Sequence, residues 1–357
     1  MAVSIHEIAR LAGVSAPAVS AVLKGSSQTI RVSRERAAKI RQIAQDLGYR
    51  RQWRSSIMRE GRTHLVGLLG TRDRITKTHD TSLLRGLEDQ LATFGLALTL
   101  VQTCKGHHEL LMDGRFDGCL IDFVVQPEQV RAIHDVRLPG IIINAEPRQG
   151  IPAVRLDEAA AMRSCVDHLI QLGHRRICYI DQLAENETSR RWGSELQRRR
   201  LAAWQGAIEG RKGITWSLAE VSSLIYDDPA GAIAKSGLCD LFRKPAADRP
   251  SGFITYNAVL AFTVCDLADR LGLLCPRDFS LVSMSDADML RYWRTPISSI
   301  SEDFLALGSK AAMQLHTLIG QCREVGDKPF GDLVELDVLI RSPLVERGST
   351  GPAPDRP

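Results

Sequence analysis

Apolar residues recur at helical spacing three times in the first 50 residues. The first set follows Ser4, whose hydroxyl can cap a helix, and ends at Gly13, which allows a tight turn. The second follows Ser15 and carries Pro17 in its first turn, where a missing N–H costs little. The third begins after Ser33 and ends before a glycine. The apolar positions of the three sets are Ile5, Ile8, Ala9, Leu11 and Ala12, then Val14, Val19, Val22 and Leu23, then Ala37, Ile40, Ile43, Ala44 and Leu47.

Three short helices with a tight turn between the first two are typical of a helix-turn-helix unit, which lays the start of its second helix in the major groove of DNA. The side chains that should point outward from that helix are small, so base readout would depend on Ser20 and on methyl contacts with thymine. Basic side chains and helix amino ends would contact the phosphates. The residues of this head that we expect to contact DNA are Ser4, Ser15, Ala16, Pro17, Ala18, Ser20, Ala21, Arg31 and Arg34.

From His64 onward, the pattern changes to short apolar runs separated by helical segments. Such runs are typical of buried parallel strands, and their alternation with helices predicts sheets that carry helices on both faces. Two series of runs predict two lobes, with ligand sites at the carboxyl ends of the strands. The runs span residues 64–70, 96–102, 118–125 and 140–144 in the first series, and 175–181, 221–226, 252–256 and 279–285 in the second.

Charge separates the head from the body. The 357-residue chain has a formal net charge of +4, yet residues 1–62 carry 12 Lys/Arg against 4 Asp/Glu, which is +8. A basic head on a mildly acidic body is typical of a domain that binds a polyanion, although a solvated basic face would look the same. No apolar run of about 18 residues is present, and the first residues lack an apolar core. We therefore expect no membrane span, no signal peptide and a cytoplasmic location.

Neither the spacing of the cysteines nor any known catalytic motif in the sequence indicates a metal site, a cofactor or an enzyme active site. There is no Cys-x-x-Cys pair, which favours reduced thiols over disulfides or a zinc site. The chain also lacks a Gly-x-Ser-x-Gly elbow, a Gly-rich phosphate loop and a His-Glu-x-x-His helix, so we expect no enzyme activity. The eight cysteines lie at positions 104, 119, 165, 178, 239, 265, 275 and 322.

The head resembles the amino-terminal domain of LacI/GalR-family transcription regulators. The resemblance rests on SIHEIARLAGVSAPAVSAVLKG and VSRERAAKIRQIAQDLGY, although the segment SSQTIR between them is longer than usual. Residues 50–62, RRQWRSSIMREGR, resemble the family's hinge, which becomes a helix in the minor groove. The resemblance implies that Met58 wedges between central base pairs and that Arg50, Arg51 and Arg54 track phosphates. A basic linker is the alternative interpretation.

The body is similar to the two-lobed, periplasmic-binding-protein-like (type I) effector domain of the same family. The matching segments include LDEAAAMRSCVDHLIQLGHRRICYI and TPISSISEDFLALGSKAA. The fold class implied is a small all-α head plus this α/β body with doubly wound parallel sheets. The expected crossings between lobes lie near 155–172, 286–303 and 328–334. The domains expected are a head (1–49), a hinge (50–62), a body (63–347; lobe one 63–171 and 303–330, lobe two 172–302 and 331–347) and a disordered tail (348–357).

The resemblance also implies an effector site between the lobes. Arg200 would offer a donor fork to a carboxylate, a phosphate or vicinal hydroxyls, although the run Arg198–Arg200 also fits a solvated helix face. Asn257 and Asp157 would bond hydroxyls, and Phe304 fits either a core or a ligand-covering position. Ala258 and Ser285 stand where sugar binders often place Asp, which favours a partly anionic effector. The implied effector residues are His79, Asp80, Asp157, Arg200, Asn257, Ser285 and Phe304.

Together these features predict a sequence-specific transcription regulator, a repressor, that binds a near-palindromic DNA operator as a homodimer. A small-molecule effector would shift the population of DNA-competent subunits. Two alternatives fit the same residues: a DNA-binding regulator that has lost effector sensing, and a solute-binding protein. The second alternative leaves the basic head without a role.

Overall fold

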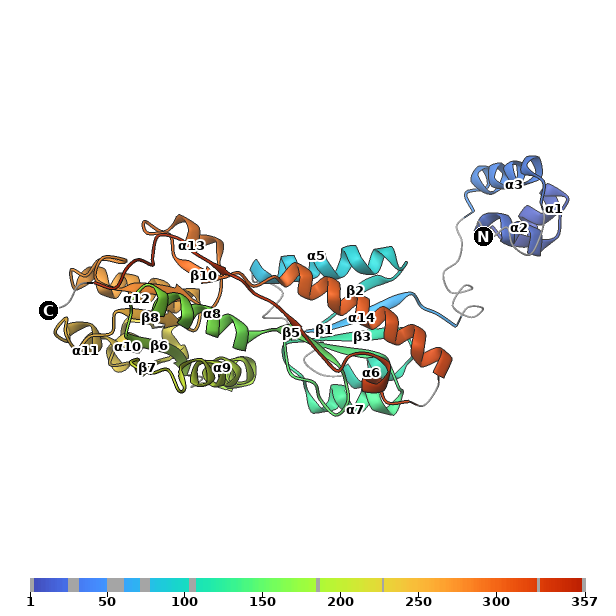
Figure 1. The fold of residues 1–357 in the computed structure, drawn as a ribbon. Coiled ribbons are helices and arrows are strands. Elements are labelled where there is room, and N and C mark those ends of the chain that lie inside the picture. Colours follow the sequence, from blue (N-terminus) through green and yellow to red (C-terminus); the bar gives the residue numbers. More distant parts are fainter. Residues whose placement is uncertain are drawn as a thin grey trace. The chain divides into compact units, whose positions relative to one another are not determined.

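The computed structural model describes residues 3–24, 32–49, 61–70, 78–102, 107–183, 187–226, 228–325 and 328–354. The chain divides into two compact units, residues 1–63 and 64–357 (Figure 1). The described part of the first unit contains α1 (Ile5–Ala12), α2 (Ala16–Lys24) and α3 (Arg34–Asp46). These are the three helices that the apolar pattern predicts.

The helix boundaries in the head have the expected local causes. The Ser4 hydroxyl accepts a hydrogen bond from the backbone N–H of Glu7, and Ser33 does the same for Arg36. Gly13 ends α1 with φ of 66°, a left-handed conformation that glycine adopts without strain. The head core consists of Ile8, Ala9, Val19, Ile40 and Ala44.

The second unit contains two six-stranded sheets in its described part, each the centre of a lobe. The first sheet has the order β11-β5-β4-β3-β1-β2, and all its strand pairs are parallel. Its strands are β1 (Leu65–Gly70), β2 (Ala97–Gln102), β3 (Gly118–Asp122), β4 (Gly140–Ile143), β5 (Ala153–Leu156) and β11 (Asp337–Ile340). The helices of the first lobe are α5 (Thr78–Thr93), α6 (His107–Met112), α7 (Pro127–Asp135), α14 (Phe304–Val325) and α15 (Phe330–Leu333).

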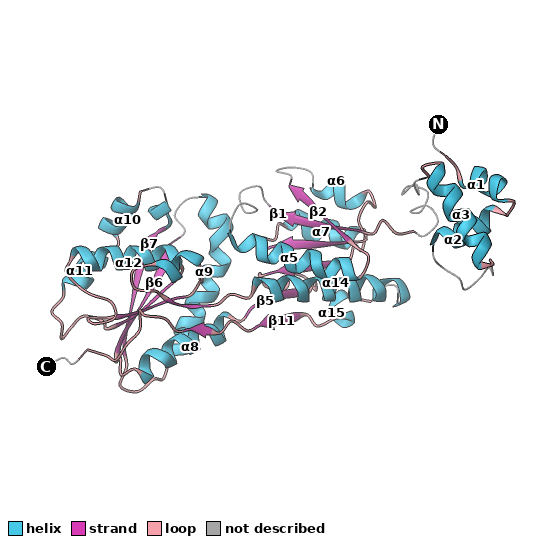
Figure 2. Cartoon of the chain, turned by 90° about the horizontal axis from the view of Figure 1, so that it is seen from above, coloured by secondary structure: helices cyan, strands magenta, loops and turns pink. Residues whose placement is uncertain are grey.

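The second sheet has the order β12-β10-β9-β8-β6-β7, in which only the β10–β12 pair of the described strands is antiparallel. Its strands are β6 (Arg176–Leu183), β7 (Thr215–Ser222), β8 (Gly252–Thr255), β9 (Ser280–Ser283), β10 (Ser298–Ile300) and β12 (Leu344–Val345). The helices of the second lobe are α8 (Glu158–Gln171), α9 (Glu187–Ile208), η1 (Ser223–Tyr226), α10 (Pro229–Lys235), α11 (Leu238–Arg243), α12 (Ala258–Arg270) and α13 (Asp288–Tyr292). Figure 2 shows strands and helices by colour in both lobes.

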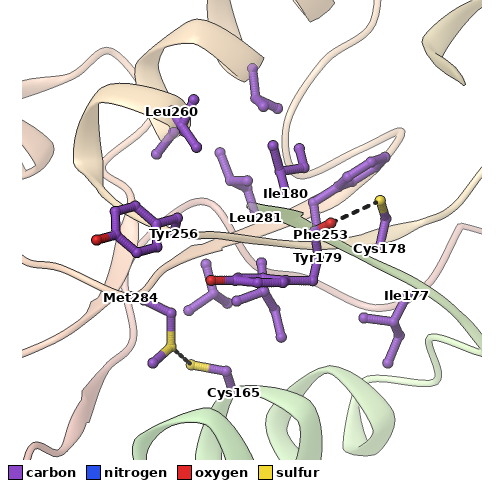
Figure 3. Close-up of a cluster of buried hydrophobic side chains, with 14 of the residues drawn as sticks. Cys165, Ile177, Cys178, Tyr179, Ile180, Phe253, Tyr256, Leu260, Leu281 and Met284 are labelled. Carbon is purple, nitrogen blue, oxygen red and sulfur yellow. Dashed lines mark hydrogen bonds between the residues drawn. The ribbon is translucent and has the colours of Figure 1, made fainter. Parts of the chain in front are cut away.

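Each lobe has its own hydrophobic core because the central strands of its sheet are buried on both faces. In the second core, the Sγ of Cys165 on α8 lies 3.8 Å from the Sδ of Met284 (Figure 3). Tyr179 of β6 stacks on Trp204 of α9, with ring centroids 5.6 Å apart. This packing fixes α9 against the second sheet.

Close helix packing in the first lobe depends on two glycines. A Cβ at Gly86 of α5 would lie 2.2 Å from the carbonyl oxygen of Leu305, and a Cβ at Gly308 of α14 would lie 2.4 Å from that of Leu83. Figure 1 shows α5 and α14 side by side. Only residues without a side chain let the two backbones approach this closely.

Within the described residues, the chain passes between the lobes at three crossovers. They join β5 to α8, β10 to α14 and β11 to β12. The crossovers are bonded to one another: the Asp157 N–H donates to the Ile340 carbonyl, and the Ser301 N–H donates to the Pro343 carbonyl. Any change in the lobe arrangement therefore acts on these bonded segments.

The structure corrects three of the predicted boundaries. The segment 157–171 packs in the second core and β11 pairs in the first sheet, so lobe one comprises about 64–156, 304–325 and 328–340 of the described chain. The run 221–226 only ends a strand, because β7 begins at Thr215 and η1 follows it. A helix that follows a crossover is apolar on one face wherever it packs, so its sequence does not identify its lobe.

The carboxyl-terminal segment is also different from the prediction of a disordered tail. The Ser349 hydroxyl is buried, accepts from the Ser298 N–H and donates to the Leu281 carbonyl. The Ala353 N–H donates to the Leu172 carbonyl. Residues 348–354 are therefore packed along the second lobe, and the polar composition of the tail misled the sequence prediction.

Candidate functional site

The start of α2 presents small side chains at the surface of the head. Pro17 is exposed, and Ala16, Ser20 and Ala21 are partly exposed. Ala18, which we predicted to point outward, is 7% exposed and lies inward beside Val19. The correct outward positions of this helix are therefore 16, 17, 20 and 21.

The other predicted DNA contacts divide into two groups. Ser4, Ser15 and Arg34 are exposed at helix amino ends, where N–H groups are available to phosphate oxygens. Arg31, Arg50, Arg51, Arg54 and Met58 lie outside the described residues. The same holds for the side chains of His79 and Asp80, although their backbone belongs to α5.

Arg200 lies at the meeting point of the second lobe and two crossovers. Its Nε donates to Glu158 Oε2 at 2.9 Å, and its Nη2 donates to Glu158 Oε1 at 3.4 Å and to Glu302 Oε1 at 2.9 Å. Its Nη1 donates to the Tyr256 carbonyl and to Ser285 Oγ at 3.1 Å. An arginine has five N–H donors, so every donor of Arg200 has a protein acceptor. The predicted open fork is closed in this structure.

The environment of Arg200 is buried and close to electroneutral. The side chains of Arg200, Glu158 and Glu302 are 2%, 5% and 7% exposed. Burial raises the pKa of Glu302 to about 7, against the lowering effect of the Arg200 cation. Burial alone would lower the pKa of Arg200, but the charges of Glu158 and Glu302 outweigh it and raise that pKa. The arginine therefore stays a cation and is already neutralised by this chain.

The neighbouring polar candidates are also engaged in internal hydrogen bonds. Asn257 caps α12 by accepting from the Leu260 N–H, and its Nδ2 donates to Gln182 Oε1 at 3.0 Å. Asp157 caps α8 by accepting from the Ala160 N–H at 2.9 Å. Asn257 and Ser285 thus follow strands β8 and β9 of the second lobe, Arg200 reaches this edge from α9, and each of the three already has a protein partner.

Phe304 lies in the core of the first lobe. It is 7% exposed, and its ring centroid lies 6.2 Å from that of Phe123. Of the two interpretations that the sequence left open, the structure favours the core position.

Direct contacts between the lobes connect α9 to the loop after β4. Arg199 donates to the carbonyl and to the Oδ1 of Asn144 at 3.1 and 3.2 Å. Glu195 accepts from the Glu146 N–H and from Arg148 Nη2. Asn144 adopts φ of 53°, a left-handed conformation that Asn tolerates better than most residues and that turns the chain toward α9. These contacts hold the two lobes together on the α9 side.

Several residues of this region were absent from the sequence prediction. Glu158 follows the predicted Asp157, Glu302 lies two residues before the predicted Phe304, and Arg199 precedes Arg200. The only sequence signal for Glu158 and Glu302 was that each is an acidic residue near a predicted crossing between the lobes. The sequence could not show that two such crossovers meet on one arginine.

Within the part of the chain that the structure describes, no cluster of His, Cys, Asp or Glu has the arrangement of a metal site. The described cysteines are all free thiols, and burial raises the pKa of Cys119 to about 12. No described helix combines the length and apolarity needed to cross a bilayer.

The helix-turn-helix head and the two-lobed α/β body define the class of ligand-responsive transcription regulators. The family model of lacI-type bacterial regulatory proteins matches residues 4–52, and the model of the periplasmic binding protein-like domain matches residues 166–350. The chain belongs to the lacI family of bacterial regulatory proteins, and it carries that family's periplasmic-binding-protein-like domain.

Relatives of known name match nearly the whole chain. The HTH-type transcriptional regulator PtxS of Pseudomonas putida is 23% identical over 98% of this chain and 96% of its own. The HTH-type transcriptional repressor CytR of Escherichia coli is 25% identical over 95% of this chain and 96% of its own. Both matches extend from the head through both lobes.

Solved structures share the fold. The lac repressor dimer bound to operator and the anti-inducer ONPF has a TM-score of 0.74 at 19% identity, covering 98% of this chain and 100% of that chain. The transcriptional regulator CelR in complex with cellobiose has a TM-score of 0.61 at 20% identity, covering 97% and 99%. The predicted fold class is confirmed.

Proposed function

We propose that this transcription regulator is a repressor that binds a near-palindromic operator as a homodimer and responds to a small molecule between its lobes. The observation that carries the proposal is the joining of two parts in one chain. A capped helix-turn-helix head presents the exposed start of α2, and the body has two lobes joined by bonded crossovers. A repressor acts where the chromosome is, so we place the protein in the bacterial cytoplasm.

The relatives support this assignment. CytR is named a repressor, and the lac repressor structure is a dimer on its operator. Two-fold symmetry in a protein dimer requires two-fold symmetry in its DNA site. Rigid docking of the head would place Ala16, Pro17, Ser20 and Ala21 at base edges, with the hinge arginines on phosphates.

We propose a neutral, hydroxyl-bearing effector in place of the partly anionic one that the sequence favoured. Glu158 and the ionised form of Glu302 neutralise the charges of the adjacent Arg199 and Arg200, so above pH 7 no excess positive charge remains there to attract an anion. The CelR structure contains cellobiose, a neutral sugar, which agrees with this chemistry. Hydroxyl groups can exchange hydrogen bonds with Asp157, Asn257 and Ser285, three of the proposed effector residues whose side chains the structure describes.

The same internal bonds favour a second candidate, a DNA-binding regulator without effector sensing. The side chains of Arg200 and Asn257 already form hydrogen bonds with other residues of the protein. The same would be seen in a protein that has lost its ligand site. Titration of operator affinity against a broad metabolite panel separates the two. A change in affinity with one neutral compound supports sensing, and unchanged affinity across the panel supports the second candidate.

Selection of bound sequences from random DNA tests the head assignment. The full chain should select two inverted half-sites at fixed spacing. Ala21→Arg should add a preference for G at one position in each half-site, because arginine pairs in a bidentate manner with G. Ala38→Arg adds the same charge at an exposed site on α3 and should leave the selected sequence unchanged. A selected sequence that changes with Ala38→Arg and not with Ala21→Arg would contradict the assignment of α2.

A further inference from the structure

The carboxylate of Glu302 binds Arg200 in the way that the carboxylate of a small-molecule ligand would. It comes from the crossover between β10 and α14, and it reaches Arg200 on α9 of the second lobe at 2.9 Å. The arginine's other carboxylate partner, Glu158, is the first residue of α8, directly after the crossover from β5. One second-lobe cation therefore binds one acid from a crossover and one from the helix start that follows another crossover.

The geometry leaves no room for an outside carboxylate on this cation. Nη2 is shared between Glu158 and Glu302, and Nη1 between the Tyr256 carbonyl and Ser285. The Arg200 guanidinium carbon also lies 5.1 Å from the centroid of the Tyr256 ring, which covers another approach. A free anion can reach Arg200 only by replacing one of these groups.

The side chains of Arg200, Glu158 and Glu302 are buried, so the loss of any one of their hydrogen bonds is costly. A buried charge that loses its partner is strongly destabilising, because neither water nor another group replaces the lost bond. Arg200 has a side-chain exposure of 2%, so it depends on both carboxylates. The crossovers are also bonded to each other through the backbone, so a displacement of Glu302 reaches the other crossovers.

We propose that Glu302 is a built-in carboxylate ligand of Arg200, which holds the crossovers to the second lobe and excludes anionic small molecules from this cation. Glu302 is a positioning and specificity-determining residue. It acts through Arg200 on the lobe arrangement, and the proposal rests on the proposed function only in that the lobe arrangement is what an effector changes.

Chemical rescue tests this proposal. Glu302→Ala removes the side-chain carboxylate together with one methylene carbon, and acetate contains the same number of heavy atoms in the same order. Full-length Glu302→Ala protein should unfold at lower urea than the wild type at pH 8. Acetate, compared with chloride at equal ionic strength, should then raise its urea midpoint by about 0.3 M or more in a saturable manner. The wild type and Glu324→Ala, which removes an exposed glutamate of α14, should show no such shift.

The design also covers a variant that does not fold. Glu302→Ala protein that fails to fold in chloride should recover soluble, folded chain on refolding from urea in acetate. Glu302→Gln keeps an oxygen acceptor for Arg200 without the charge, and it should fold and show no acetate response. The proposal is overturned by a Glu302→Ala protein that is as stable as the wild type, or by an acetate response equal in all variants or absent from Glu302→Ala. The readout needs no DNA, so its failure is distinct from a failure of operator binding.

Discussion

At the scale of single residues, the function of Arg200 depends on which atoms already bind it. The sequence predicts that Arg200 offers an anion-binding fork, and the structure instead shows its five donors bound by Glu158, Glu302, Ser285 and the Tyr256 carbonyl. The charges balance within the protein. The carboxylates of Glu158 and Glu302 therefore determine which ligands can reach this cation. The arginine in the sequence does not by itself reveal these partners.

The protonation of Glu302 gives a stability prediction with a defined sign. Because burial raises its pKa from 4.5 to about 7, the folded chain binds this proton more tightly than the unfolded chain. The stabilisation is complete below the ordinary pKa and is lost as the pH rises toward and through 7. The groups that face Glu302 are Arg200 on α9, Glu158 on α8 and Ser285 after β9.

We expect the wild type to lose on the order of 2–3 kcal/mol of stability relative to Glu302→Gln between pH 5 and pH 8. Urea unfolding of both full-length proteins across this range measures the difference. Parallel pH profiles for the two proteins would show that Glu302 does not titrate in this way.

A second residue-scale prediction concerns two hinge residues outside the described part of the chain. Met58→Ala should weaken operator binding more than non-specific binding, because a wedge acts only in the deformed specific complex. Arg54→Ala should weaken binding to all sequences and flatten its salt dependence, because a phosphate contact releases counterions. Gel-shift titrations on operator and on unrelated DNA at several salt concentrations compare the two. Equal losses for Met58→Ala on both DNAs, or an unchanged salt slope for Arg54→Ala, would contradict these roles.

At the scale of elements, the pair α5–α14 depends on backbone contact at Gly86 and Gly308. A methyl group at position 308 would lie 2.4 Å from the Leu83 carbonyl oxygen, so the helices must separate. Gly320 lies on the same helix α14, and a Cβ there would meet nothing within 4 Å. Substitution by alanine at Gly308 and at Gly320 should therefore change the stability of the protein in opposite directions.

Gly308→Ala should destabilise the full-length protein by about 3 kcal/mol through overpacking. Gly320→Ala should stabilise it by up to about 1 kcal/mol through helix propensity. Urea or thermal unfolding measures both. Similar stabilities for the two variants would mean that the helices separate at little cost.

The helices and strands also show which parts of the fold can be predicted from the sequence. Ser4, Gly13 and Ser33 mark the head helices correctly because caps and left-handed glycines are local features. The buried strands β1, β3, β4, β6, β8 and β9 were found from their apolar runs. β10 has three residues and β12 has two, which is too short for a pattern, and the lobe to which α8 belongs depends on distant contacts.

The candidate site was predictable in part for the same reason. The family resemblance indicates Arg200, Asn257 and Ser285, and the structure shows that Asn257 and Ser285 follow strands β8 and β9 while Arg200 reaches the same edge from α9. It could not give their partners, because Glu158, Glu302 and Gln182 are 42, 102 and 75 residues away from the groups they bind. Phe304 was ambiguous because an aromatic residue fits both a core and a ligand-covering position, and the outward placement of Ala18 was wrong because a small residue fits a core as well as a surface.

At the scale of the whole molecule, regulation requires that the lobe arrangement can change and that a ligand can bias it. The crossovers are hydrogen-bonded to each other, and α9 is bonded to the loop after β4 through Arg199 and Glu195. These contacts stabilise the observed arrangement against opening on that side. An effector must add to these contacts or compete with them.

The pair Arg148–Glu195 measures one lobe-to-lobe contact. Its side chains are 38% and 20% exposed, and it is part of the contact between α9 and the first lobe. A double-mutant cycle with Arg148→Ala and Glu195→Ala should give a coupling energy of about 1 kcal/mol in unfolding, reduced at high salt. The same cycle at Arg85 and Asp89, an exposed pair within α5, should give less than about 0.5 kcal/mol. Equal couplings would show that the lobe contact adds nothing beyond a surface ion pair.

The most direct test of the account is the affinity of the purified full-length protein for its selected operator, measured against bulk genomic competitor DNA with and without metabolite pools. The account predicts that operator is bound at least about 1,000-fold more tightly than competitor, and that a neutral metabolite changes this ratio. No preference for any sequence over genomic competitor under either condition would contradict it.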